Sequence, residues 1–195
     1  LNQSNMIRVR FAPSPTGYLH IGGLRTALYN YLFAKQNNGK LVLRIEDTDR
    51  TRLVDGAIEN LISTLEWSGI EFDEGPHKSG EYGPYTQSER LSIYNKHVLE
   101  LINNGNAYPC FYPSERIEQI KAKNLPSDIV AEYDRRYRDL NIAEAIDRMP
   151  NENHVVRLKV PSKGNIVIQD QIRGNIEFDL SLIQDQIIIK SDGYP

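Results

Sequence analysis

The sequence predicts an α/β protein, a parallel sheet with helices on both faces, interrupted by a smaller α+β subdomain. Three observations predict this class: a strand–helix–strand alternation in the first 45 residues, carboxylates directly after its second strand, and a change of pattern after Tyr108 that becomes β-rich over residues 154–190. A helical crossover makes the two strands parallel. Open parallel sheets bind ligands where their strands end, so the carboxylates indicate the binding edge.

The composition is that of an ordinary globular protein: 195 residues, 39% hydrophobic and 25% charged. A net charge of −3 argues against nucleic-acid binding by bulk electrostatics, although a local basic face remains compatible with it. The single cysteine, Cys110, excludes an internal disulfide and a cysteine cluster for zinc. No apolar run approaches the ~20 residues of a membrane span, and residues 1–5 lack a secretory signal layout. We therefore expect a reducing, aqueous compartment.

The first strand is expected over residues 7–12 and the second over residues 40–45. The helix between them ends at Asn37-Asn38-Gly39, where asparagine or glycine suits the left-handed C-terminal position. Helical spacing predicts the face of this helix that packs on the sheet, namely Leu24, Leu28, Tyr31 and Leu32.

The same spacing predicts two further helices. The apolar stripe of the first consists of Ala57, Ile58, Leu61, Ile62 and Leu65. The stripe of the second consists of Leu91, Tyr94, Val98, Leu101 and Ile102. Ser88 is a candidate N-cap for this second helix. The turn-rich loop 71–87 is too long for a simple connector, so we expect it to be functional.

We expect residues 1–107 to form the first half of the α/β domain and residues 108–185 to form the inserted subdomain. Residues 186–195 are expected to return to the α/β domain. A strand containing three isoleucines closes the chain, and a buried parallel strand of this kind normally feeds another helix. The fold is therefore expected to be incomplete at Pro195.

Within and after the insertion, the expected elements are short. Helices are predicted near residues 115–123 and 142–148, with Asn141 capping the second in a variant of the capping box. Strands are predicted over residues 155–160, 166–169, 175–178 and 186–190.

The loop after the first strand carries His20, Gly22 and Gly23 where a helix begins. Backbone N–H groups at a helix N-terminus bind anions, and glycine lets a phosphate approach the main chain closely. A histidine there can hydrogen-bond phosphate oxygens in a transition state, or it can be a half-buried residue satisfied by backbone. The absence of Gly-x-Gly-x-x-Gly and of Gly-Lys-Ser/Thr argues against an NAD site and a P-loop.

Arg10 and Glu46 each fall near the end of a strand, so both can face one crevice. A guanidinium binds a carboxylate through two parallel hydrogen bonds and a glutamate binds an ammonium, so together they suit a zwitterionic amino acid. A mutual salt bridge is an equally good interpretation of the spacing. A magnesium site at Glu46-Asp47-x-Asp49 is conceivable, but we rank it below helix capping by Thr48 or Asp49.

A basic run with interleaved tyrosines lies in the middle of the chain. Its members are Arg135, Arg136 and Arg138, with Lys121, Lys123, Tyr133 and Tyr137 nearby. Arginine and tyrosine suit an RNA backbone and stacked bases. Interspersed acidic residues make a solvated helix face an equally good interpretation.

Four blocks in register resemble the N-terminal part of the glutamyl-tRNA synthetases, a branch of the class I aminoacyl-tRNA synthetases. The blocks are Arg10–Gly17 with His20–Gly23, Arg44–Arg50, Gly83–Arg90 and Lys190–Pro195. The resemblance covers nearly all of residues 7–195. It implies a Rossmann-like class I synthetase catalytic fold, interrupted by an insertion that binds the tRNA acceptor stem.

The resemblance implies an aminoacyl-tRNA ligase that joins L-glutamate to tRNA(Glu) through glutamyl-adenylate, with ATP bringing Mg²⁺. It assigns the side-chain carboxylate of glutamate to Arg10 and the α-amino group to Glu46. The remaining residues of the amino acid pocket are Ala12 and Ser14. The ATP-binding residues are Pro13, His20, Gly22 and Gly23, of which the last three stabilise the pentacoordinate phosphate. The expected tRNA contacts are Asp49, Arg52, Arg135 and Arg136.

The sequence departs from the family pattern in three ways. Gly23 replaces the second histidine of the general class I motif, as is usual in this branch. Tyr112 and Tyr137 stand where zinc-binding relatives have cysteines, so no zinc is expected. The second signature loop, of the Lys-Met-Ser-Lys-Ser type, is absent, so we expect this piece alone to be weak or inactive. We expect a cytoplasmic monomer without membrane contact.

Two other functions stay open. One is a glutamyl-queuosine tRNA(Asp) synthetase, against which Thr48 and Gly83-Pro84-Tyr85 argue. The other is a non-catalytic tRNA-binding fragment. A glutaminyl-tRNA synthetase is disfavoured by the Pro13–Gly17 loop. Charging of tRNA(Glu) alone is not distinguished from charging of tRNA(Gln) as well.

Overall fold

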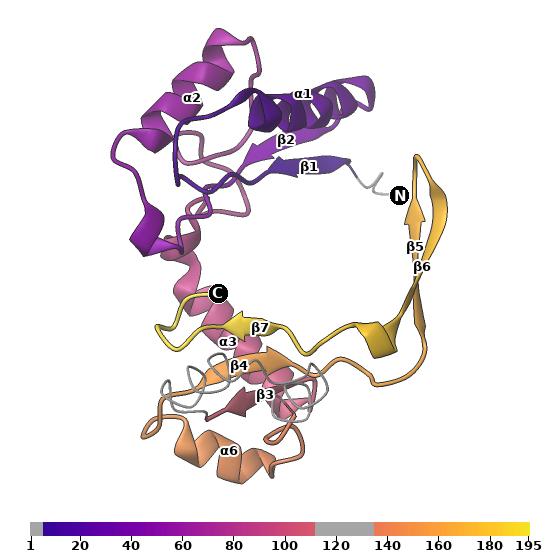
Figure 1. The fold of residues 1–195 in the computed structure, drawn as a ribbon. Helices are drawn as coiled ribbons and strands as arrows, with labels where there is room; N and C mark the ends of the chain where they lie inside the picture. Colours follow the sequence, from indigo (N-terminus) through magenta and orange to yellow (C-terminus); the bar gives the residue numbers. More distant parts are fainter. Residues whose placement is uncertain (1–5, 112–134) are drawn as a thin grey trace, which may run out of the picture. The chain divides into compact units, whose positions relative to one another are not determined.

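The structure is a computed structural model that describes residues 6–111 and 135–195 (Figure 1). It divides into two compact units, Leu1–Ser92 and Ile93–Pro195. The predicted domain boundary at residue 107 stays a prediction. The predicted helix near residues 115–123 lies outside the described residues, as do Tyr112, Lys121, Lys123 and Tyr133.

The first unit begins with the predicted strand–helix–strand crossover. Strand β1 (Arg8–Phe11) leads into helix α1 (Ile21–Gln36) and then into strand β2 (Lys40–Leu43). The two strands are parallel, in a register that pairs Arg8 with Lys40 and Phe11 with Leu43. Helix α1 ends as expected at a left-handed asparagine, since Asn38 has a φ of 50°.

Helix α1 packs on the sheet through a different face from the predicted one. Leu28 and Leu32 are 43% and 53% exposed, so their placement in the interface was wrong. The buried residues are Ala27 and Ala34, at 0% and 2% exposure, with Leu24 and Tyr31 packed beside them. Small side chains allow the helix backbone to approach the strands closely, and a ranking by hydrophobicity alone overlooks this.

Helix α2 (Ala57–Trp67) confirms its predicted buried stripe. It shares one core with α1 and with one face of the two strands (Figure 1). The buried members of that core include Phe11, Leu41, Leu43, Ile45, Leu61 and Leu65. Side chains alternate between the two faces of a strand. The residues at the other alternate positions, among them Arg8, Arg10 and Arg44, therefore lie on the opposite face of the sheet.

The predicted functional loop extends the sheet edge beside β2. Asp73 N donates to Leu41 O at 2.8 Å, and Leu43 N donates to Glu74 O at 2.8 Å. Further along, Ile45 N donates to Tyr85 O at 2.9 Å. Parallel bridges therefore fix two parts of the loop next to β2. Short 3₁₀ helices follow the two loops, at Arg50–Arg52 and Gln87–Arg90.

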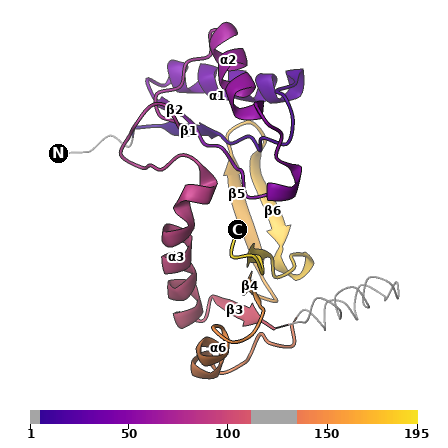
Figure 2. The same cartoon turned by 90° about the vertical axis from the view of Figure 1, so that its left-hand side faces the viewer.

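In the second unit, helix α3 (Leu91–Asn103) packs against an antiparallel sheet ordered β3-β4-β7 (Figure 2). The strands are β3 (Ala107–Cys110), β4 (Val155–Leu158) and β7 (Ile187–Ile189). Their core with α3 consists of Val98, Ile102, Ala107, Val156 and Ile189.

The remaining elements of this unit match the predictions closely. Helix α6 (Ile142–Arg148) is capped as expected, because Asn141 Oδ1 accepts from the Ala143 and Glu144 amides. Strands β5 (Asn165–Asp170) and β6 (Gly174–Asp179) form an antiparallel hairpin. A 3₁₀ helix, Leu180–Leu182, follows.

Strand β7 is not the parallel strand that its isoleucines predicted. It pairs antiparallel with β4, and Ile187 is 44% exposed while Ile189 is buried. An apolar run indicates that a strand is buried but does not indicate its direction, because the direction depends on the strand with which it pairs. Among the described helices, none is both long and apolar enough to cross a membrane.

Candidate functional site

The candidate site lies in the first unit, where β1 and β2 end and their two loops run side by side. Arg44 N donates to Phe11 O at 3.0 Å, and Glu46 N donates to Pro13 O at 2.9 Å. Pro15 is buried, Ala12 and Pro13 are half-buried, and Ser14 is exposed. These backbone contacts fix the loop after β1 against the acidic block after β2.

Arg10 and Glu46 meet, as the strand ends predicted. Arg10 Nη1 lies 3.2 Å from Glu46 Oε1, so the mutual ion pair that the spacing allowed is present. A second guanidinium shares the same oxygen: Arg44 Nη2 lies 2.7 Å from Glu46 Oε1. The sequence reasoning did not assign Arg44 a role. The signal was available, because Arg44 follows Val42 with strand spacing on the face that carries Arg10.

A buried carboxylate lies on the same face. Glu74 is 3% exposed, and its Oε2 accepts from Arg8 Nη2 at 2.6 Å and from the Tyr85 hydroxyl. Lys40 Nζ lies 3.5 Å from its other oxygen. The Arg8 hydrogen bond is the main cause that lowers the pKa of Glu74, to about 2. Burial, with the bond to Glu74, raises the pKa of Tyr85. The sequence reasoning missed Glu74.

The arginines of this face line a pocket of about 210 Å³. Its charged and aromatic lining consists of Arg8, Arg10, Arg44, Arg90, Tyr82 and Tyr85. Four guanidinium groups line it, and the two neighbouring carboxylates, Glu46 and Glu74, offset only part of their charge. The pocket therefore suits a small carboxylate ligand, which a guanidinium binds through paired hydrogen bonds.

His20 is the N-cap of α1. Its Nδ1 accepts from the Gly22 amide at 3.1 Å, so the neutral ring carries its proton on Nε2. The ring is exposed rather than half-buried, and the backbone satisfies one of its nitrogens. A Cβ at Gly22 would lie 2.8 Å from His20 Cε1, so the imidazole ring would have to shift if a larger residue stood at position 22. The α1 N-terminus thus presents both an imidazole N–H and backbone amides for an anion.

The carboxylates of the acidic block are held by separate partners. Asp47 accepts from the Ser88 amide at 2.8 Å and from the Ser88 hydroxyl at 2.6 Å. Asp49 binds the Arg52 guanidinium and the Thr51 hydroxyl. The described residues contain no group of three or more His, Cys, Asp or Glu side chains placed to hold a metal ion.

Both capping predictions at this block, Ser88 for α3 and either Thr48 or Asp49 for the acidic block, are therefore wrong. Ser88 does not cap α3, because it lies inside the preceding 3₁₀ helix and binds Asp47. Thr48 directs its hydroxyl to Gln87 Oε1, and Asp49 makes no side-chain cap bond to the 3₁₀ helix after it. The polar side chains tie the acidic block to the neighbouring segment, a role that local spacing does not reveal.

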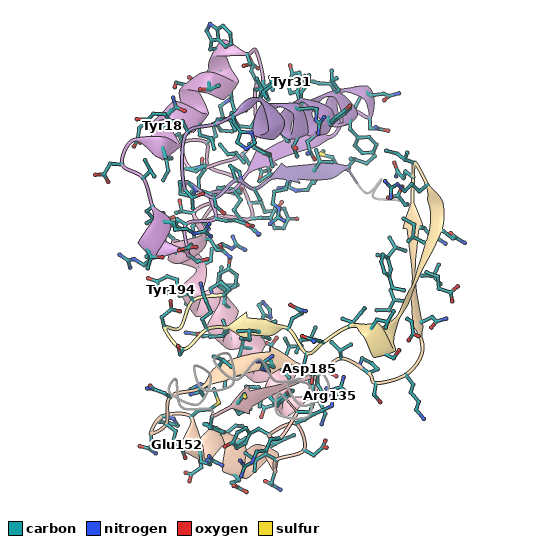
Figure 3. The ribbon with its side chains drawn as sticks, viewed as in Figure 1. Tyr18, Tyr31, Arg135, Glu152, Asp185 and Tyr194 are labelled. Atoms are coloured by element: carbon teal, nitrogen blue, oxygen red, sulfur yellow. The ribbon has the colours of Figure 1, made fainter. Side chains whose placement is uncertain are left out.

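The basic run in the second unit is only partly a surface feature. Arg136 is exposed and lies over the Tyr137 ring, and Arg135 is half-buried. Arg138 instead binds Asp185, which is 3% exposed and is labelled with Arg135 in Figure 3. Asp185 also accepts from the Tyr108 hydroxyl at 2.9 Å. Arg138 thus belongs to a buried polar cluster and not to a solvated face.

The residues expected to replace zinc ligands take part in aromatic packing where they are described. Cys110 is buried at 1% exposure. The Phe111 and Tyr137 rings meet edge to face at 5.6 Å, and the Arg148 guanidinium lies over Phe111 at 4.2 Å. The expected absence of zinc stays a prediction.

Comparison with known proteins adds to this geometry. Residues 6–195 match the family described as tRNA synthetases class I (E and Q), catalytic domain. A glutamate–tRNA ligase of Finegoldia magna is 52% identical over 200 residues, and one of Chlorobaculum parvum is 50% identical over 196 residues. Each alignment covers 97% of this chain but only 41% and 39% of the relative, respectively.

Solved structures give the same result. The crystal structure of a glutamate tRNA ligase from Elizabethkingia meningosepticum, in complex with its amino acid, superposes with a TM-score of 0.83 at 39% identity. The glutamate-tRNA synthetase of Elizabethkingia anophelis has the same TM-score at 40% identity. They are covered over 39% and 40% of their chains, so this chain spans about two fifths of such proteins.

Proposed function

Because the chain belongs to the catalytic-domain family of the class I tRNA synthetases for glutamate and glutamine, we propose that it is the glutamate-activating part of a glutamate–tRNA ligase. The reaction joins L-glutamate to tRNA(Glu) through glutamyl-adenylate. The observation that carries the proposal is the Arg10–Glu46–Arg44 cluster beside a small cationic pocket. The names of the relatives support the choice of amino acid.

Glutamate has two carboxylates, and the enzyme must activate only the one on the α-carbon. Arg10 binds the side-chain carboxylate and keeps it away from ATP, while Glu46 binds the α-ammonium. The α-carboxylate is then the free nucleophile. Glutamine has the same shape but lacks the charge, so it would leave Arg10 without a carboxylate partner, and such sites reject the uncharged analogue strongly.

ATP binds at the N-terminus of α1. The first step forms a bond between an α-carboxylate oxygen of glutamate and the α-phosphorus, and the bond to pyrophosphate breaks. The Nε2–H of His20 and the amide of Gly23 stabilise the charge on the phosphate oxygens in this transition state, while the Gly22 amide holds the His20 ring in place. Pro13, Ala12 and Ser14 shape the loop between the two substrates, and Mg²⁺ arrives with ATP. In the second step, a hydroxyl at the tRNA 3′ end attacks the glutamyl carbonyl and AMP leaves.

For tRNA, we propose contacts through Asp49, Arg52, Arg135 and Arg136. Arg136 supports this assignment because its exposed guanidinium stacks over Tyr137, as suits a base or phosphate. A cytoplasmic monomer remains a prediction. Of the other functions, glutamyl-queuosine tRNA(Asp) synthesis shares the activation step and differs in the tRNA product.

The test is glutamate-dependent exchange of pyrophosphate into ATP, by the full-length gene product with and without tRNA. We expect exchange with L-glutamate in the presence of tRNA(Glu), and not with L-glutamine. Exchange without charging of the tRNA(Glu) 3′ end would favour the queuosine enzyme. Tight tRNA binding without any exchange would instead support a non-catalytic tRNA-binding function.

A further inference from the structure

Arg44 holds Glu46 more closely than Arg10 does. The Nη2–Oε1 distance from Arg44 is 2.7 Å, against 3.2 Å for Nη1 of Arg10. The Arg44 side chain is 25% exposed and that of Arg10 is 46% exposed. A shorter and less hydrated charge pair is the stronger one. Arg44 is thus the more permanent partner of Glu46, and Arg10 the more easily detached one.

Both arginines contact the same atom of Glu46. Within residues 6–111 and 135–195, no contact is seen to the second oxygen, Oε2. A carboxylate has two oxygens and about four lone-pair sites, so Oε2 can accept from a ligand ammonium while Oε1 keeps its arginine. The arrangement leaves one binding position open on a carboxylate that is already oriented.

Backbone hydrogen bonds fix the segments that carry Arg44 and Glu46, and the Arg44 side chain keeps one buried nitrogen without a hydrogen-bond partner among the described residues. The Arg44 and Glu46 amides both bond to carbonyls of the β1 segment, at 3.0 and 2.9 Å. The Nε of Arg44 is buried and has no hydrogen-bond partner among the described residues. Such orphaned polar atoms are rare and need an explanation. Holding the terminal nitrogen against Glu46 provides one.

We propose that Arg44 is a positioning residue that reserves Glu46 for the substrate ammonium and keeps Arg10 available for the substrate side-chain carboxylate. The inference rests on the proposed glutamate activation and assigns Arg44 a task within it. Arg44 keeps Oε1 throughout, the ammonium takes Oε2, and Arg10 moves from Glu46 to the incoming carboxylate. Without Arg44, Glu46 would bind Arg10 through both oxygens, and glutamate would have to break that pair before it could bind.

Arg44→Met in the full-length enzyme tests the proposal. In this variant glutamate must first separate Arg10 from Glu46, so we expect KM for glutamate to rise about tenfold or more. Once separated, Arg10 contacts the substrate equally in the ground and transition states, so kcat should change less than about threefold. KM for ATP should stay unchanged. Arg44→Lys should recover part of the loss, since a lysine keeps the charge but not the planar donor set. Lys35→Met removes an exposed positive charge from the same unit without touching Glu46, and is the matched control.

A second background separates positioning from packing. In Glu46→Gln, Arg44 no longer has a carboxylate to orient, so Arg44→Met should change KM for glutamate by less than about twofold there. An equal rise of KM in both backgrounds would overturn the proposal, because it would show that the aliphatic stem of Arg44 matters and its bond to Glu46 does not. An unchanged KM in the single variant would overturn it too.

A stability cycle keeps this result distinct from the proposed function. Urea unfolding of the single and double variants measures how strongly each arginine couples to Glu46. We expect the Arg44–Glu46 coupling to exceed the Arg10–Glu46 coupling by about threefold or more in the folding equilibrium constant. If the wild-type enzyme fails to activate glutamate, the proposed function fails, whereas a stronger Arg10–Glu46 coupling would refute Arg44 as the anchor.

Discussion

At the scale of single residues, the site depends on how a few charged side chains choose their partners. Glu46 is shared by two arginines, Glu74 is held by Arg8 and Tyr85, and His20 uses one ring nitrogen to cap a helix. The contacts of Glu46 and His20 leave three groups available, namely the second oxygen of Glu46, the Arg10 guanidinium and the imidazole N–H of His20. These are the groups that an amino acid and a phosphate need.

Arg10→Ala removes the group proposed to bind the glutamate side chain. We expect kcat/KM for glutamate in pyrophosphate exchange to fall by about 100-fold or more, because losing one partner of a charged hydrogen-bonded pair costs about 2–5 kcal/mol. The kcat/KM of Arg10→Lys should fall between that of Arg10→Ala and that of the wild type. Near-normal activity of Arg10→Ala would remove Arg10 from the pocket.

Gly22→Ala places a methyl group 2.8 Å from the His20 ring, which must then move. We expect activity to fall about tenfold while stability changes by less than about 1 kcal/mol, because the lost cap is offset by the better helix propensity of alanine. Kinetics of Gly22→Ala, His20→Ala and the double variant check this. The double variant should be no worse than His20→Ala, and additive losses would show that Gly22 acts independently of His20.

At the scale of elements, packing between helices, strands and loops determined which residues are buried and how the sheet edge is completed. Helix α1 meets the sheet through alanines, and the loop 71–87 completes the edge of β2 through backbone bonds. That loop also places Glu74 in contact with Arg8 of β1. The packing of the first unit and the charge of its pocket therefore depend on the same segment.

The α1 interface predicts an inverted sensitivity to substitution. Ala27 is fully buried, so Ala27→Leu should cost about 1–3 kcal/mol of unfolding free energy through overpacking. Leu28 is 43% exposed, so Leu28→Gln should change stability by less than about 0.5 kcal/mol. Urea denaturation of the two variants measures both effects. A larger loss in Leu28→Gln would place the buried face where the sequence pattern first predicted it.

The Glu74 ion cluster predicts an acid sensitivity of the first unit. Its pKa falls from an ordinary value of 4.5 to about 2 because Arg8 bonds to the charged form. The folded state therefore binds fewer protons than the unfolded state, so this contribution is complete above about pH 4.5 and is lost as the pH falls toward 2. Glu74→Gln should be less stable at pH 7 and should lose less stability on acidification. Unfolding at a series of pH values checks this, and parallel profiles for the two proteins would contradict it.

At the scale of the whole molecule, the two units contain different structural features. The first holds the charged pocket and the α1 N-terminus, and the second holds a small antiparallel sheet with the Arg138–Asp185 cluster. Family membership covers both, since the match runs from residue 6 to residue 195. The chain nevertheless spans only about two fifths of its relatives, so complete activity is a property to be measured on the full-length product.

Metal content is a prediction for the molecule as a whole. Cys110 is the single cysteine of the chain, and Tyr137 packs edge to face on Phe111. We expect elemental analysis of the purified protein to find well under one zinc per chain. Cys110→Ser should then leave the metal content unchanged. One zinc per chain that is lost in Cys110→Ser would show that Cys110 is a metal ligand.

The sequence by itself determined the strand–helix–strand crossover, the left-handed helix end at Asn38 and the meeting of Arg10 with Glu46. These features follow from local periodicity, from turn chemistry and from the rule that parallel strands end at one edge. Such signals are contained within a short stretch of chain, so they can be interpreted without knowing the neighbours.

Only the tertiary structure decided that Arg10 and Arg44 meet at one oxygen of Glu46, that Glu74 is buried against Arg8, that Leu28 faces outward and that β7 runs antiparallel. Each of these depends on a partner distant in sequence, and several partners of similar chemistry were available. A charged residue pairs with whichever opposite charge the fold brings within about 4 Å. An apolar strand joins whichever edge is free, so the partner and not the pattern fixes its direction.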